Sequence, residues 1–329
     1  MSLKLKRSLL LAGLAAALPA VPAAQAQDAW PTEPITIVVP FDAGGSVDRL
    51  ARGLAEHMSP IIGQPMAVEN RPGAGGQSGT SYFLSRPQDC NTLMVSPASP
   101  YILTNILVTG ADYTLDDFDF VNAQWIDFAM VMTNKDKPYQ TLEELIEAIK
   151  ANPGELSVAV VFGSIGQIAT MVLLDALGIP AEDVRLVTYD GGAGSRTAVA
   201  GGQVDFAVEQ AEGSDTIRDM IRPLALFRTE AHPEWDAPLI NDVLKPMGAE
   251  VPILSGSVRT LVAPAGCKAE FPERWEKVMA SYEEALNTPA FQEWAEGNQI
   301  GADWVGHEET EAIISNNLAV LEEYKDLLD

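Results

Sequence analysis

One recurring pattern constrains the fold of this chain: a β-rich apolar run, a glycine-containing turn, and a segment with helical spacing of apolar side chains. Residues 35–41 (ITIVVPF) form the first run, residues 42–45 the first turn, and apolar side chains recur at helical spacing from Ser46 until Gly63. A continuous apolar run is typical of a strand buried on both faces. Strands that alternate with helices predict an α/β fold with largely parallel sheets.

The pattern continues through most of the chain. Further strands are predicted at 66–69, 92–96, 125–133, 157–162, 185–189, 204–208, 224–227 and 257–263, and the tail is predicted to be helical at 273–286, 290–296 and 308–327. These strands are too many for one small sheet, so we expect two, with crossings near 125–133 and 257–263. Two crossings form a hinge, and ligands of such sheets bind beyond the carboxyl ends of the strands. The predicted domains are residues 27–127 with 257–329, and residues 128–256.

The first 26 residues have the pattern of a secretory signal peptide. Lys4, Lys6 and Arg7 precede an apolar run at 9–18 that is too short to span a bilayer, and Ala24–Ala26 is a small-x-small cleavage site. No cysteine follows the run, which argues against a lipoprotein anchor. We therefore expect cleavage near Ala26 and a mature protein that is free in the periplasm.

The net charge of the chain limits the kinds of partner that it can bind. The chain has 21 basic and 46 acidic residues, a formal net charge of −25. Such a chain would not neutralise phosphates, so a nucleic-acid partner is not expected. An anionic ligand would have to be held by local donors against this long-range field.

The cysteines and histidines do not indicate a metal site. Cys90 and Cys267 are the only cysteines, and an oxidising compartment permits a disulfide between them; two separate thiols are the alternative. His57, His232 and His307 are scattered along the sequence, away from either cysteine. We expect no metal and no cofactor.

Three glycine-rich turns, at residues 40–48, 162–167 and 189–195, each follow a predicted strand and open a helix. Free backbone N–H groups at a helix N-terminus and the positive end of the helix dipole favour an anion. Glycine also permits the positive φ that directs successive N–H groups at one point. Turns from both domains could hold the two ends of a small dicarboxylate. No Gly-Lys-Ser/Thr sequence follows, so these turns are not phosphate-binding P-loops.

At these turns the chain resembles the periplasmic substrate-binding subunits of tripartite tricarboxylate transporters, the Bug family. The matching stretches are 30–48, 63–79, 188–206 and 261–266, and the block Asn70–Gly76 is the most specific. The resemblance implies a two-domain periplasmic-binding-protein (Venus flytrap) fold and a small di- or tricarboxylate or aromatic acid as ligand. It also implies two membrane transporter subunits as partners. We expect a monomer that delivers the acid to them.

The predicted ligand-binding residues come from these turns and from neighbouring strand ends. They are Phe41, Ala43, Gly44, Gly45, Ser46, Ser96, Ser99, Phe162, Gly163, Ser164, Gln167, Tyr189, Gly191, Gly192, Ala193, Gly194 and Glu209.

Several of these side chains have more than one interpretation. Ser46 is expected to cap its helix with its N–H on the ligand, Asp48 to accept nearby N–H groups, and Arg196 to be a solvated helix arginine. Glu209 either recognises an amino or hydroxyl group of the ligand or makes a contact at the hinge. By the resemblance, Gln167 stands where the family often has a histidine. An aspartate is common in the family directly after the strand 204–208, and this chain has Glu209 and Gln210 there instead.

Two rival functions are weighed against transport. An enzyme is not expected, because the chain has no Gly-x-Ser-x-Gly elbow and no histidine near a glycine turn to serve as base. A binding module that delivers the acid to a sensor kinase would have the same cleft, so it stays the alternative. The sequence leaves open which acid is bound.

Overall fold

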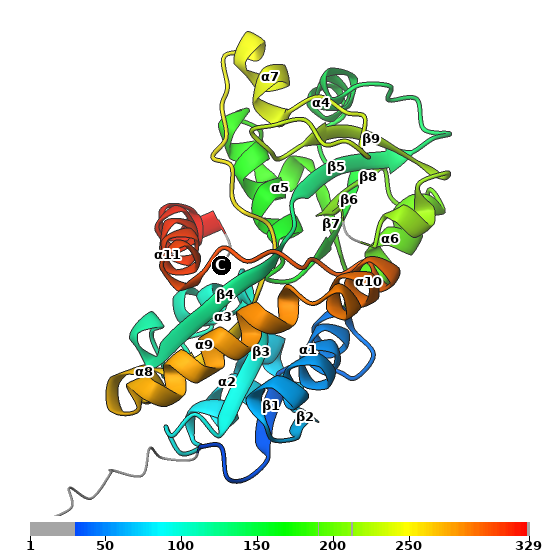
Figure 1. Ribbon diagram of the computed structural model, residues 1–329. Helices are drawn as coiled ribbons and strands as arrows, with labels where there is room; N and C mark the ends of the chain where they lie inside the picture. Colours follow the sequence, from blue (N-terminus) through cyan, green and yellow to red (C-terminus); the bar gives the residue numbers. More distant parts are fainter. Residues whose placement is uncertain (1–29, 190, 212, 328–329) are drawn as a thin grey trace, which may run out of the picture. The chain divides into compact units, whose positions relative to one another are not determined.

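The computed structural model describes residues 30–189, 191–211 and 213–327, so the predicted signal peptide (1–26) lies outside the described part. The strands form two five-stranded sheets (Figure 1). The first sheet has the order β2 (Met66–Asn70), β1 (Ile35–Val39), β3 (Thr92–Ser99), β10 (Val258–Pro264), β4 (Phe118–Ile126). The second has the order β7 (Arg185–Tyr189), β6 (Ser157–Val161), β8 (Phe206–Gln210), β5 (Ala129–Asn134), β9 (Ile221–Leu226).

Each sheet is mixed, which corrects the prediction of largely parallel sheets. β10 is antiparallel to both β3 and β4, and β5 is antiparallel to both β8 and β9. The pairs β1–β2, β1–β3, β6–β7 and β6–β8 are parallel. β5 starts soon after β4 ends and therefore enters the second sheet at the edge where the parallel strands finish. Because it enters from that edge, it must run against them, and β10 does the same in the first sheet.

The two connections between the sheets are hydrogen-bonded to each other. The predicted strand 125–133 is in fact two strands, since β4 ends at Ile126 and β5 begins at Ala129. Between the two strands, the backbone N–H of Asp127 donates to the carbonyl of Ser257 (3.1 Å). The carbonyl of Asp127 accepts from the backbone N–H of Gly256 (2.8 Å). A Cβ at position 256 would lie 2.2 Å from the Asp127 carbonyl oxygen, so only glycine permits this approach.

Helices surround both sheets. They are α1 (Ser46–Ile62), α2 (Gln77–Leu84), α3 (Tyr101–Leu107), α4 (Leu142–Ala151), α5 (Ile165–Ala176), α6 (Gly192–Ala200), α7 (Ile240–Leu244), α8 (Ala265–Glu270), α9 (Pro272–Leu286), α10 (Pro289–Asn298) and α11 (His307–Tyr324). Gly63 ends α1 in the left-handed conformation, at φ 90°, as the sequence suggests. The short helix α3 was not predicted, because its residues (YILTNIL) have neither a capping residue before them nor the length of a clear helical period.

The C-terminal part of the chain returns to the first sheet. Asn122 of β4 is fully buried, and its Nδ2 donates to the carbonyl of Asp303 (2.8 Å). Its Oδ1 accepts from the backbone N–H groups of Val305 (2.8 Å) and Gly306 (3.0 Å). Before these residues in the chain, α9 packs beside α1 (Figure 1). Through these contacts, the C-terminal part of the chain packs on the first sheet and its helices.

A disulfide joins Cys90, just before β3, to Cys267 in α8. The structure therefore decides between the two alternatives for the cysteines in favour of a bond. In the described part of the chain, every helix is too short or too polar to cross a bilayer.

Candidate functional site

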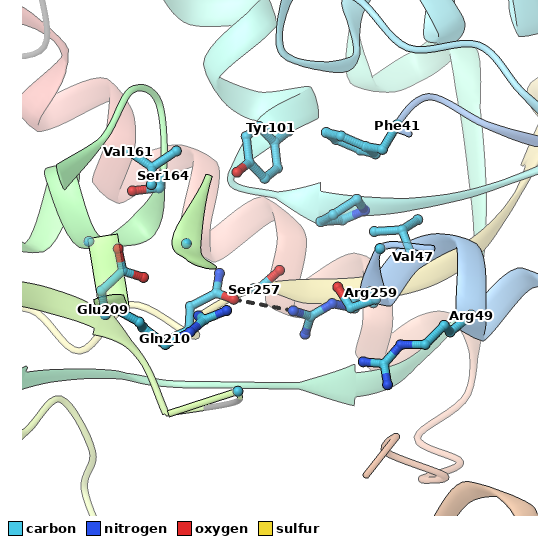
Figure 2. A pocket seen from close by; sticks show the side chains of 17 residues that line it. Phe41, Val47, Arg49, Tyr101, Val161, Ser164, Glu209, Gln210, Ser257 and Arg259 are labelled. Carbon is cyan, nitrogen blue, oxygen red and sulfur yellow. Dashed lines mark hydrogen bonds between the residues drawn. The ribbon is translucent and has the colours of Figure 1, made fainter. Parts of the chain in front are cut away.

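A pocket of about 300 Å³ lies where the parallel strands of both sheets end (Figure 2). Its walls come from both sheets and from the helices that follow their strands. The lining residues are Phe41, Gly45, Ser46, Val47, Arg49, Pro97, Tyr101, Val161, Ser164, Gly166, Gly192, Arg196, Glu209, Gln210, Gly213, Ser257 and Arg259.

The N-terminus of α1 forms the first-sheet wall of the pocket. Gly45, Ser46 and Val47 line it, so the positive end of the helix dipole faces the cavity. The N-cap residue is Gly45, and no side chain caps this helix end. The expectation that Ser46 caps the helix is therefore wrong, because α1 starts one residue earlier than a Ser46 cap requires.

The loop before α1 is held by Asp48, as predicted for this carboxylate. Asp48 is 3% exposed and accepts from Gly44 N (2.8 Å), Arg52 Nε (2.9 Å) and Asn70 Nδ2 (3.0 Å). Burial acts to raise its pKa, but the hydrogen bonds from these three groups outweigh burial and leave the pKa below its ordinary value. The Gly44 amide is thus occupied within the protein.

A similar closed arrangement opens α5 in the second sheet. Ser164 is the N-cap, and its hydroxyl accepts from Gln167 N (3.2 Å). In return, Oε1 of Gln167 accepts from Gly163 N (2.7 Å). This is the reciprocal bonding of a capping box, shifted by one residue. The prediction that every glycine turn presents free N–H groups is therefore wrong for Gly163 as it is for Gly44.

Arginine side chains supply most of the positive charge in the pocket. Arg259 of β10 is 3% exposed; its guanidinium lies 4.1 Å from the Trp125 ring centre, and Nη2 donates to Gln210 Oε1 (3.2 Å). Arg196 of α6 is half-buried and also lines the pocket, in contrast to the expectation of a solvated helix arginine. Arg49 lines it as well and is exposed.

Two glycines make room for the Arg196 guanidinium. A Cβ at Gly192 would lie 2.8 Å from its Nη1, and a Cβ at Gly213 would lie 3.0 Å from its Nη2. Gly213 also has a φ of 75°, which favours glycine on its own account. The guanidinium is therefore placed against bare backbone on both sides.

Glu209 brings a buried carboxyl group to the same pocket. It ends β8 together with Gln210 and is 5% exposed. Burial raises its pKa, while the Ser195 hydroxyl and the Arg196 guanidinium act in the opposite direction. Tyr101, the first residue of α3, also lines the pocket; burial is the main cause that raises its pKa, and the charge of Glu209 raises it further.

The structure brings part of the predicted ligand-binding set to the pocket: Phe41, Gly45, Ser46, Ser164, Gly192 and Glu209. Outside the lining are Ala43, Gly44, Ser96, Ser99, Phe162, Gly163, Gln167, Tyr189, Gly191, Ala193 and Gly194. Ser96 and Ser99 are 1% exposed within β3, and Phe162 is 58% exposed. The ligand contacts of all these residues stay a prediction.

Sequence reasoning missed Arg259 and Tyr101. A signal for Arg259 exists in the sequence, since it is the one charged residue of the predicted strand 257–263, which is a predicted crossing. Tyr101 gives no comparable signal, because it stands in the unpredicted helix α3.

One cluster in the described residues has the residue types of a metal site. Ligand atoms of Asp119, His307 and Glu311 lie within 4.8 Å of one another. His307 Nδ1 is 2.7 Å from the Phe120 carbonyl, which can only accept, so Nδ1 donates to it. Lys268 Nζ lies 2.6 Å from Nε2, and this ammonium supplies the positive charge of the cluster. Glu311 Oε1 also lies 3.4 Å from Nε2, so both an ammonium and a carboxylate contact this ring nitrogen.

Comparison with known proteins agrees with this architecture. The family described as "Tripartite tricarboxylate transporter family receptor" matches residues 50–321. A relative from Pseudomonas sp. (strain P51), named "UPF0065 protein in tcbD-tcbE intergenic region", is 30% identical over 275 residues, which is 82% of this chain and 79% of the relative.

Solved structures share the fold. The periplasmic binding protein BugD is 24% identical with a TM-score of 0.68, and the match covers 91% of this chain and 98% of BugD. The R. palustris protein Rpa4515, solved with adipate, is 26% identical with a TM-score of 0.71, over 91% of this chain and 98% of Rpa4515. The fold is thus the two-domain α/β fold of periplasmic binding proteins, with the two connections described above as its crossings.

Proposed function

The chain belongs to the tripartite tricarboxylate transporter receptor family, whose members are substrate-binding proteins and not enzymes, and from this premise we propose that its pocket captures a small carboxylate. The ligand class is a di- or tricarboxylate or an aromatic acid. The relative Rpa4515 was solved with adipate, which supports an acid as ligand.

The observation that carries the proposal is the convergence of Arg196, Arg259 and the N-terminus of α1 on one pocket. Guanidinium groups and helix N-termini are strong partners for a carboxylate. Each hydrogen bond to a charged group contributes about 1.5–3 kcal/mol, and micromolar affinity requires about 8 kcal/mol. Four or five such bonds reach this value, less the entropic cost of ordering the ligand and protein.

We further propose that the protein delivers the acid to two membrane transporter subunits. Family membership supports a transport role, and a signal peptide at residues 1–26 would place the mature chain in the periplasm, where such receptors act. Deletion of the gene should abolish uptake of the bound acid by whole cells, and normal uptake in the deletion strain would contradict this partnership.

The ligand itself is accessible to direct measurement. Small molecules released from the purified protein by denaturation should include a carboxylic acid in the mass spectrum. Calorimetric titration of the emptied protein with that acid should give one site per chain. Binding only of neutral sugars or of cations would refute the proposal.

A further inference from the structure

We propose that Glu209 makes the pocket selective for acids that also carry a hydrogen-bond donor, a hydroxyl or an ammonium group. This inference rests on the proposed function and specifies its ligand class. The relevant feature is a buried carboxylate that lines a pocket otherwise built for a negatively charged ligand.

The carboxylate of Glu209 lacks a hydrogen-bond partner on one side. It is 5% exposed, and within the described residues Oε1 has no partner at hydrogen-bond distance. A buried acceptor without a partner costs free energy that a ligand donor can recover. In Figure 2 this side chain stands on the wall with Ser164, apart from Val47 and Arg49.

The Ser195 hydroxyl and the Gln210 amide lie close enough to the carboxylate to lower its pKa, but neither is at hydrogen-bond distance from Oε1. The side chain of the next residue, Gln210, accepts from the Arg259 guanidinium through Oε1 and is therefore directed at Arg259. The Ser195 hydroxyl is also buried without a hydrogen-bond partner at ordinary distance. The Glu209 acceptor therefore stays open on the wall of the pocket that also carries Arg196.

The charges divide the pocket into two parts. A ligand carboxylate is attracted to Arg259 and to the start of α1, and it is repelled by the charge of Glu209. A donor group on the same ligand has the opposite preference. A site built to hydrogen-bond a ligand group rejects the analogue that lacks it, because its own polar group is then left buried and unpaired. An acid that has both groups is the occupant that satisfies both parts.

Two matched ligand sets test the inference by calorimetry on the mature protein: succinate, malate and aspartate, and 3-phenylpropionate, 3-phenyllactate and phenylalanine. Within each set only the substituent changes, from hydrogen to hydroxyl to ammonium. We expect at least one substituted acid to bind tenfold or more tightly than its unsubstituted parent. Aspartate or phenylalanine in the lead identifies the donor as ammonium, and malate or phenyllactate identifies it as hydroxyl.

Variants show whether the preference comes from Glu209. Glu209→Leu should reduce the ratio between substituted and parent acid to near one, and Glu209→Gln should reduce it more for ammonium than for hydroxyl. Glu147→Gln, on the exposed face of α4, is the matched control and should leave both ratios unchanged. Circular dichroism checks that each variant is folded, and the wild-type ratio tests the preference without any variant.

The outcomes separate this inference from the proposed function. Equal or tighter binding of the parent acid, or release of an acid without a donor group from the purified protein, overturns the inference and leaves carboxylate capture intact. Release of a hydroxy or amino acid supports it even where neither test set binds. Failure of every acid to bind, together with release of a non-acid, overturns the proposed function as well.

Discussion

Arg259 in β10 of the first sheet donates a hydrogen bond through Nη2 to Oε1 of Gln210 at the end of β8 in the second sheet, over 3.2 Å (Figure 2). The bond lies at the pocket and connects side chains of the two sheets. The guanidinium is also stacked against Trp125 in β4. Arg259 therefore has a fixed position from which it can meet a ligand bound between the sheets.

Replacement of this arginine should weaken acid binding. Because a hydrogen bond to a charged group contributes about 1.5–3 kcal/mol, Arg259→Met should lower the affinity for the recovered acid roughly 10- to 100-fold. Calorimetric titration measures the change. Arg71→Met is the control, because Arg71 has a half-exposed side chain away from the pocket lining. Unchanged affinity in Arg259→Met would show that the guanidinium does not contact the ligand.

The space beside Arg196 gives a second test of the pocket. In Gly192→Ala the new Cβ would meet Nη1 of Arg196 at 2.8 Å, and the flexible guanidinium would move away. We expect several-fold weaker binding with little change in melting temperature. Gly297→Ala is the control, because its Cβ meets nothing within 4 Å and it lies outside the pocket lining, so this variant should bind normally. Equal affinities for the two variants would contradict the role of Arg196.

Gly166 is expected to matter for stability, because α5 packs closely on β8. A Cβ at this position would lie 2.0 Å from the Val208 carbonyl oxygen. Gly166→Ala should therefore lower the free energy of unfolding by about 1–3 kcal/mol, measured by urea denaturation.

The same substitution has the opposite sign at Gly297 of α10. A Cβ there meets nothing within 4 Å, so Gly297→Ala should stabilise the protein by about 0.5–1 kcal/mol through helix propensity. If both variants lost stability, or neither did, the close approach of α5 to β8 would not explain the effect of Gly166→Ala.

The hydrogen bonds to Asp48 should make stability depend on pH in the acid range. The folded-state pKa of Asp48 is lowered from the ordinary 3.8, so its contribution is fully present above that value and is lost as the pH falls through the folded pKa. Asp48→Asn should be less stable than wild type at pH 7, and the difference should shrink below about pH 4.

Thermal unfolding across pH 2.5 to 7 measures this difference. Asp236→Asn, at an exposed position, serves as the control and should follow the wild type throughout. A difference between Asp48→Asn and wild type that stays constant over the whole range would rule out the ionised carboxylate as its source.

The disulfide joins Cys90 and Cys267, which are 177 residues apart in the sequence, and so closes a long loop. The double variant Cys90→Ser, Cys267→Ser should therefore lose about 2–5 kcal/mol of unfolding free energy. A reducing agent should lower the stability of the wild type and leave that of the double variant unchanged. Two free thiols per native chain in a thiol assay would contradict the bond.

Much of the local structure follows from the sequence pattern. The first strand, the helix that ends at Gly63, and the turn-helix units beyond β6 and β7 are all where periodicity and glycines predict them. The domain boundaries at 127–128 and 256–257 stay a prediction, although the two sheets draw their strands from those segments. These features are local, because apolar spacing and turn residues act over a few positions of the chain.

The sequence alone therefore determined the α/β class, the family and the presence of glycine turns at strand ends. Only the tertiary structure decided that Asn70 donates to Asp48 and that Arg259 meets Gln210. The physical reason is that partner choice depends on which groups the fold brings within about 3 Å. Residues 210 and 259 lie in different sheets, and no local pattern records that their strands meet at one pocket.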